Sequence, residues 1–145
     1  MIGVYFRNRY GIAKVIDIEK VNGIEVLVFD KNVVFMVNKE TGKIRDDILT
    51  NKLALLDNID LTKIKHSKEI IDLIEEGDII EYDSNNWGTD ILEVVVEVCP
   101  VKEDYDKGEG FVCTALDDNI RKKHIKSIIT KEQIEKIKYE VKIWR

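Results

Sequence analysis

The chain has 145 residues, of which 44% are hydrophobic, and a formal net charge of −5. This length allows one domain or two small ones with a real core, and the single proline argues against a disordered linker. Two cysteines do not make a disulfide framework, and we see neither a signal-peptide pattern nor an apolar run long enough to span a bilayer, so we expect a cytoplasmic protein.

The charge is unevenly distributed along the chain. Residues 1–64 carry ten basic and nine acidic groups, whereas residues 69–118 carry sixteen acidic groups and two lysines. Residues 119–145 carry nine basic and three acidic groups. A strongly acidic middle followed by a basic end is the least random feature of the sequence.

The first half reads as a series of short strands separated by turns. Asn22-Gly23 is a strong hairpin signal, because both residues tolerate positive φ. The region 51–64 fits neither the strand period nor the helix period. We predict strands at 2–7, 12–19, 24–30 and 33–38, with either a fifth strand or a short helix at 43–50.

The central stretch, residues 65–82, predicts a helix, a stop and a strand in succession. Ser67 is a suitable N-cap, and Gly77 can end a helix in the left-handed conformation. Isoleucine and leucine side chains at 70, 71, 73 and 74 form one apolar face. A helix of about ten residues is too short to persist alone, so we expect it to dock on a β unit.

The second half predicts further strands and one more helix. In the strand at 89–98, Leu92, Val94, Val96 and Val98 share one face. Thr130 opens a capping box with Gln133, and we expect Ile134 and Ile137 to point inward from the helix that follows. The remaining predicted elements are a turn at 83–88, a polar loop at 101–110 and strands at 111–116, 125–129 and 139–144.

Together these elements predict a mainly β (α+β) protein. We expect two small antiparallel barrel or meander units of SH3-like type, an N-terminal one at 1–64 and a C-terminal one at 65–145, joined by the short central helix. Whether the two units pack as one body is left open.

The segments KHSKEIIDLIEEGD and IKSIITKEQIEKIKYEV resemble those of small proteins encoded by phages and prophages of Gram-positive, clostridial-type bacteria. The resemblance covers about half of the chain, and its motifs are caps, apolar faces and turns. No activity is established for that family, so no site residue is carried over. The resemblance implies a phage accessory protein, a class that includes inhibitors of host defence.

No signature of catalysis or of metal binding is present. His66 and His124 are isolated, and Cys99 and Cys113 are fourteen residues apart without a C-x-x-C motif. The acidic run at 103–109 matches a calcium loop only in composition. There is no nucleophile elbow and no phosphate-binding glycine loop. We therefore expect no enzyme and assign no catalytic residue, cofactor or metal.

The acidic middle predicts a surface that binds a host protein. Such a surface can compete for a basic groove that normally holds nucleic acid, and the resemblance points to the same class of inhibitor. The function that we expect is an anti-CRISPR-like inhibitor of a nucleic-acid-handling defence system. The alternative is a merely solubilising surface. The predicted contact residues are Asp83, Trp87, Asp90, Glu103, Asp104, Tyr105, Asp106 and Glu109.

The second hypothesis is a small nucleic-acid-binding module. One segment mixes aromatic and basic residues, as surfaces that stack single strands do, and another is a basic cluster suited to phosphates. A strand with one buried face and a solvated loop are the structural alternatives, and the negative net charge opposes DNA affinity. The residues are Tyr5, Arg7, Arg9 and Tyr10, and Arg121, Lys122, Lys123 and Lys126. An unrecognised enzyme is third.

Overall fold

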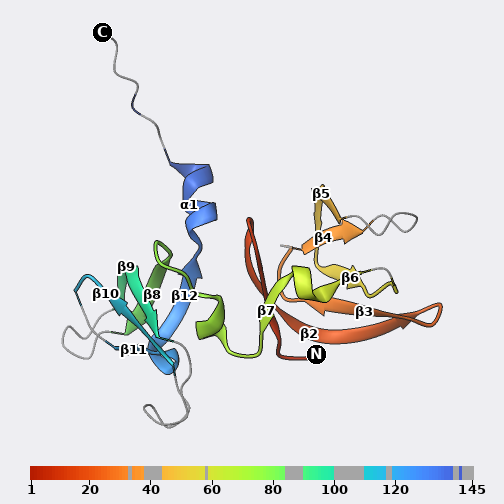
Figure 1. The fold of residues 1–145 in the computed structure, drawn as a ribbon, viewed down its shortest axis with the longest axis horizontal. Helices are drawn as coiled ribbons and strands as arrows, with labels where there is room; N and C mark the ends of the chain where they lie inside the picture. The colour runs from red at the N-terminus through yellow and green to blue at the C-terminus, as the bar shows by residue number, and fades with distance from the viewer. Residues whose placement is uncertain are drawn as a thin grey trace.

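The computed structural model describes residues 1–32, 34–37, 44–57, 59–83, 90–99, 110–116, 119–138 and 141. In this part the chain is mainly β, with two five-stranded antiparallel sheets that lie side by side (Figure 1). A two-stranded sheet, three 3-10 turns and one short α-helix complete the described elements.

The N-terminal unit is a five-stranded sheet in the order β6-β3-β2-β1-β7. Its core is built from one face of these strands and contains Val4, Phe6, Ala13, Val15, Leu27, Phe29 and Leu53. The predicted fifth strand forms as β5 (Ile44–Thr50), which pairs with β4 (Val34–Val37) in the separate two-stranded sheet. The strands of the main sheet are β1 (Tyr5–Asn8), β2 (Gly11–Val21), β3 (Ile24–Phe29), β6 (Lys52–Ala54) and β7 (Lys65–Ser67).

The hairpin predicted from Asn22-Gly23 is confirmed. Both residues have positive φ, +53° and +79°, and Val21 pairs with Ile24 across the turn. Two consecutive positive φ values are the requirement of the type I′ turn, whose twist matches that of the flanking strands. This local signal therefore fixes the register of β2 and β3.

The C-terminal unit is a second five-stranded sheet, in the order β11-β10-β9-β8-β12. Its core takes Ile71 and Ile74 from the connecting segment and Ile80, Tyr82, Val95, Val112 and Ile120 from the sheet. The helix α1 (Lys131–Ile137) follows the last strand. The strands are β8 (Ile79–Asp83), β9 (Asp90–Cys99), β10 (Phe111–Thr114), β11 (Ile120–Arg121) and β12 (Ile125–Ile129).

The two units repeat one plan. In each, the first strand lies between the long second strand and the last strand, and a 3-10 turn precedes the last strand: η1 (Leu61–Lys63) or η3 (Lys122–His124). The second strand carries a one-residue bulge against the third, at Ile16 in β2 and at Val96 in β9. A bulge bends its strand and increases the local twist. The long second strand of each unit is therefore bent at its bulge, at corresponding places in the two sheets.

The prediction of a central α-helix was wrong. The segment forms one 3-10 turn, η2 (Ile70–Leu73), whose flanking residues Glu69 and Ile74 are extended. Ser67 belongs to β7, and its hydroxyl accepts the Glu69 N–H instead of capping an α-helix. Isoleucine, as a β-branched residue, favours extended backbone, which helps to explain the outcome. The predicted burial was right, since Ile71, Leu73 and Ile74 are all buried.

Other expectations need correction or fall outside the described residues. The described strands form open sheets and do not close into barrels. Residues 65–67, at the start of the predicted C-terminal unit, pair as β7 with β1 of the first sheet. The capping box of Thr130 and Gln133 is confirmed, but Ile137 is 79% exposed instead of inward. The predicted last strand at 139–144 lies outside the described residues except for Val141.

Candidate binding surfaces at the junction of the two units

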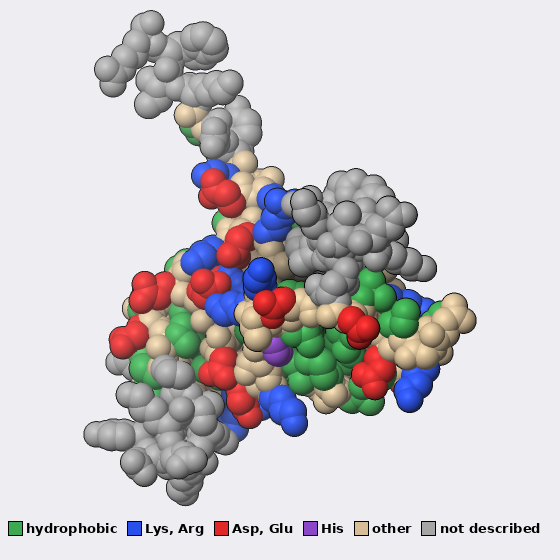
Figure 2. Space-filling view, turned by 45° about the vertical axis from the view of Figure 1, so that its right-hand side comes forward, with side chains coloured by type: hydrophobic (Ala, Val, Ile, Leu, Met, Phe, Trp, Pro, Cys, Tyr) green, Lys and Arg blue, Asp and Glu red, His purple; other side chains and the backbone are tan. Residues whose placement is uncertain are grey.

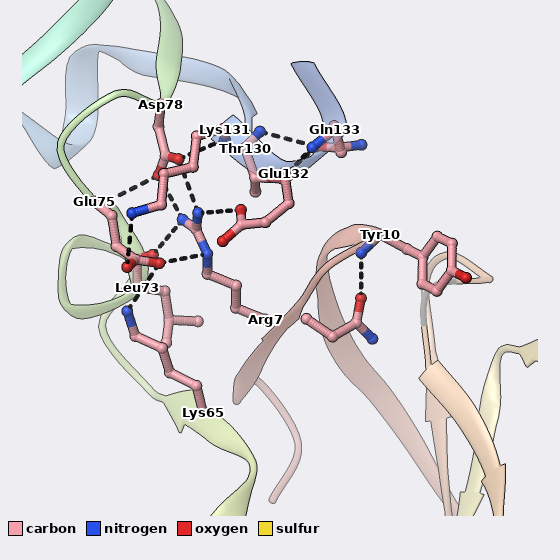
Figure 3. Close-up of polar contacts among 11 residues, drawn as sticks. Arg7, Tyr10, Lys65, Leu73, Glu75, Asp78, Thr130, Lys131, Glu132 and Gln133 are labelled. Carbon is pink, nitrogen blue, oxygen red and sulfur yellow. Dashed lines mark hydrogen bonds and ion pairs between the residues drawn. The ribbon is translucent and has the colours of Figure 1, made fainter. Parts of the chain in front are cut away.

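A buried arginine joins the two units (Figure 3). The side chain of Arg7, on β1, is 2% exposed, and its guanidinium points at carboxylates of the other unit. Its Nε lies 2.9 Å from Glu75 Oε2, and its Nη2 donates to Glu132 Oε2 at 2.7 Å and to Asp78 Oδ1 at 2.8 Å. Its Nη1 donates to Asp78 Oδ2 and to the Leu73 carbonyl. This cluster is the Arg7 clamp.

Asp78 is the centre of the clamp. It is fully buried, and besides the two bonds from Arg7 it accepts the backbone N–H of Glu75 and that of Lys131, each at 2.8 Å. Lys131 is the first residue of α1. A buried carboxylate is tolerated when all of its lone pairs are used in this way. Asp78 therefore ties together β1, the connecting segment and the start of α1.

The clamp shifts the protonation equilibria of its own members. Burial alone would lower the pKa of Arg7, but the hydrogen bond and charge of Asp78, with Glu132 and Glu75, raise it above its ordinary value. Burial acts to raise the pKa of Glu75, but the charges of Arg7 and Lys65 outweigh it and leave that pKa lowered. Both shifts favour the charged forms, so the ion pairs are maintained at neutral pH.

The clamp changes the interpretation of the first nucleic-acid segment. Arg7 is buried and held by carboxylates, so the structure contradicts its assignment to a phosphate-binding surface. Tyr10 lies against α1, with Lys136 Nζ 3.2 Å from its ring centroid and the Arg9 guanidinium 5.2 Å away. The alternation of residues along the strand does not show whether Arg7 points inward or outward. The carboxylates that bind Arg7 are distant from it in the sequence, so they do not show it either.

A groove lined by both polar and apolar side chains lies where the two units meet. Its volume is about 330 Å³, and it is lined by residues of both units. Four lysines contribute to the lining, Lys14 and Lys31 from the N-terminal unit and Lys122 and Lys126 from the C-terminal unit. Tyr5 also lines it, and Lys14 Nζ lies 5.8 Å from the Tyr5 ring centroid. Two predicted segments far apart in sequence thus meet in one place, which we name the junction groove.

Lys126 is placed by a local irregularity. It is the extra residue of a bulge in β12, since Ile125 pairs with Tyr82 and Ser127 with Glu81. Its Nζ bridges Asp83 Oδ1 at 3.1 Å and Asp90 Oδ1 at 2.8 Å. Hydrogen bonds to Asp90 and then Asp83 raise the pKa of Lys126. The pKa of Asp83 is lowered, first by its hydrogen bond with Asp90 and then by that with Lys126.

The outer face of the β8–β9 hairpin combines acidic and apolar side chains. Asp83 pairs with Asp90 and Glu81 with Leu92, so these side chains lie on the same face, two residues apart along each strand. Directly opposed like charges are unfavourable in a sheet, and Lys126 offsets them here. The face continues into exposed apolar positions: Leu92 is 60% exposed, Val94 44% and Val96 49%. We name this set the β8–β9 outer face.

The predicted site residues are only partly brought together. Asp83 and Asp90 lie side by side on the β8–β9 outer face, and Lys122 and Lys126 share the junction groove with Tyr5. Arg121 and Lys123 do not line that groove. Charges of both signs gather where the units meet (Figure 2). The predicted contact residues that lie outside the described part of the chain are Trp87, Glu103, Asp104, Tyr105, Asp106 and Glu109.

The contacts of His66 and the two cysteines are those of residues with a structural role. The His66 ring stacks on Phe6 with centroids 5.2 Å apart, and its Nδ1 lies 2.7 Å from the Ile64 carbonyl oxygen. Cys99 and Cys113 lie on adjacent strands without a disulfide bond between them, and they are not direct ladder partners. Among the described residues, no group of three His, Cys, Asp or Glu side chains is placed to hold a metal ion.

Comparison with known proteins gives no assignment. No protein-family model matches the chain, and neither the curated proteins nor the solved structures contain a match. Within the described ranges, no helix has the length and apolar character needed to cross a membrane.

Proposed function

We propose that the chain is a non-enzymatic phage or prophage accessory protein that binds a host protein in the cytoplasm through the β8–β9 outer face. One observation carries the proposal: Leu92, Val94 and Val96 are exposed in a row on the longest strand of the C-terminal unit. A contiguous exposed apolar surface rimmed by polar residues is typical of a protein-binding site.

The chemistry of the face favours a partner with a basic surface. Glu81, Asp83 and Asp90 continue the same face beyond the apolar row, and binding sites commonly combine an apolar centre with a polar rim. Lys126 already neutralises part of this acidic end. The apolar row therefore supplies the affinity, and the acidic end selects a basic partner. A nucleic-acid-handling defence complex has such a surface, and its inhibition is the role that we propose.

The proposal includes an SH3-like character for each unit. It is supported by the strand order that the two sheets share, by the bulges at Ile16 and Val96 and by the 3-10 turn before each last strand. Small β units of this kind present sheet faces and loops to other proteins, so a tandem pair suits a binding role better than a catalytic one.

The test is capture of a partner from a host lysate with tagged protein, with and without nuclease treatment. The proposal predicts a host protein that stays bound after nuclease treatment. It also predicts that expression of the chain relieves host defence against an infecting phage. Val94→Lys places a charge in the apolar row and should abolish both effects.

Val21→Lys is the matched control. Val21 is 51% exposed at the end of β2, in the other unit, and receives the same change of side chain. Retention of the partner by Val94→Lys, or equal losses in the two variants, would remove the β8–β9 outer face as the contact site. Release of the captured protein by nuclease would contradict direct protein binding.

A further inference from the structure

We infer that the junction groove binds a short segment of single-stranded nucleic acid. The inference does not use the apolar row that carries the proposed protein contact, and the two sites meet at Lys126, which lines the groove and pairs with Asp83 and Asp90. The groove is lined by four lysines and one aspartate, Asp30, together with Tyr5 and four isoleucines. The Asp30 carboxylate already accepts the backbone N–H of Lys14 at 2.8 Å.

The mixture of side chains specifies the ligand class. Lysine ammonium groups are donors without acceptors, and they suit phosphate oxygens. Tyr5 offers a ring for stacking of a base, and stacking accepts any base. The isoleucines add apolar surface for bases and sugars. A ligand that is anionic and also carries flat apolar groups matches all three features, and a nucleotide unit is such a ligand.

The origin of the lysines favours a strand over a free nucleotide. Lys14 and Lys31 lie on one unit, and Lys122 and Lys126 lie on the other, so the cations flank the groove from two sides. A volume of about 330 Å³ is at the low end for small-molecule sites. The groove therefore holds part of a chain of phosphates, and the rest of the strand extends past the lysines.

The lysines differ in availability. In the described part of the chain, neither Lys14 nor Lys31 takes part in an ion pair. Lys122 pairs with Glu69 at 3.0 Å, but both side chains are more than 40% exposed, and exposed pairs of this kind are weak. A phosphate can replace Glu69 there. Lys126 is held by two carboxylates and contributes least.

The negative net charge of the chain does not exclude binding of nucleic acid in the junction groove. Exposed charges more than about 10 Å apart are largely screened at ordinary salt concentrations, so the local set of lysines determines the potential in the groove. The net negative charge predicts that binding is weak, and the lysine–phosphate contacts predict that it falls as the salt concentration rises.

The experiment measures the fluorescence anisotropy of a labelled short oligothymidine as protein is added, at about 50 and about 200 mM salt. We expect binding at the lower salt concentration and its loss at the higher one. Lys122→Glu and, separately, Lys31→Glu should each weaken binding by about tenfold. Each should also reduce the slope of log affinity against log salt by about 0.7. Tyr5→Leu should weaken binding at least about fivefold.

The chain offers a matched control and a gain-of-function variant. Lys123→Glu makes the same charge change one residue from Lys122 but outside the groove lining, so it should weaken binding much less. Asp90→Asn should strengthen binding, because it releases Lys126 from one of its two carboxylates.

Three results would overturn the inference. They are no binding of the oligonucleotide at low salt, equal effects of the Lys122 and Lys123 variants, and competition by thymidine monophosphate as effective as that by unlabelled oligothymidine. The last result would assign the groove to a free nucleotide. Circular dichroism verifies that each variant is folded. If the Lys122→Glu variant does not fold, the Lys31→Glu variant provides the test.

Discussion

Replacement of Arg7 by methionine is the sharpest test of how the two units are held together. Methionine keeps much of the length of the side chain but removes the guanidinium, which leaves Asp78 buried without its cation. The Arg7 side chain is 2% exposed and that of Asp78 is fully buried, so water cannot replace the lost partner. Removal of one member of a buried ion pair costs about 3–5 kcal/mol. We expect a melting temperature lower by about 10 °C or more.

The assay is urea denaturation followed by circular dichroism, with Lys52→Met as the matched control. Lys52 pairs with Glu19 at 3.2 Å, but both side chains are more than 40% exposed, so this loss should stay below about 1 kcal/mol. A double-mutant cycle of Arg7→Met with Asp78→Asn should show coupling of at least about 1 kcal/mol. An Arg7→Met cost as small as that of Lys52→Met, or additive effects in the cycle, would refute the clamp.

Three further predictions concern the same junction. Glu75→Gln should reduce the loss of stability on acidification, measured as the free energy of unfolding at a series of acid pH values. Because the pKa of Glu75 is lowered from its ordinary value of 4.5, the charged carboxylate stabilises the fold at pH values above 4.5, and this contribution is lost as the pH falls through the folded-state pKa. Thr130→Ala removes the capping box of α1 and should cost about 1 kcal/mol in urea denaturation. Gly11→Ala should cost more than about 1 kcal/mol by the same assay, since φ is +136° and the new Cβ would lie 3.1 Å from Gln133 Nε2; no loss would show that the backbone adapts there.

Local signals made much of the fold predictable. Asn22-Gly23 predicts its hairpin because the turn type depends on those two residues alone. The capping box of Thr130 and Gln133 predicts the start of α1 for a similar reason, since its hydrogen bonds join residues three apart. In both places the sequence contains the whole of the interaction, so no tertiary information is needed.

The central segment failed because its helical pattern competes with pairing to a distant strand. Ser67 reads as a helix cap in the sequence, but it lies opposite Tyr5 in the ladder between β7 and β1. Only Ile70–Leu73 then remains for a helical turn. The apolar positions were still predicted correctly, because a 3-10 turn and an α-helix both bring residues three apart to similar faces.

The candidate surfaces depend on long-range contacts that no local pattern contains. Arg7 and Asp78 are 71 residues apart, so the sequence around Arg7 does not predict that its side chain binds a buried carboxylate. In β9, one alternating face carries Leu92, Val94 and Val96 and the other carries Ile91 and Val95, so both faces contain apolar residues and the pattern alone does not say which face is buried. The register does: Ile80 and Tyr82 are fully buried, and their partners Glu93 and Ile91 share their face with Val95. Leu92, Val94 and Val96 are left outside.

The most direct test of the proposed function is the affinity of the captured host protein for three forms of the chain, measured by calorimetry after both proteins are purified. The account predicts that the wild type and Val21→Lys bind equally well and that Val94→Lys binds at least about tenfold more weakly. Equal affinity of the Val94→Lys variant and the wild type would contradict the assignment of the contact to the β8–β9 outer face.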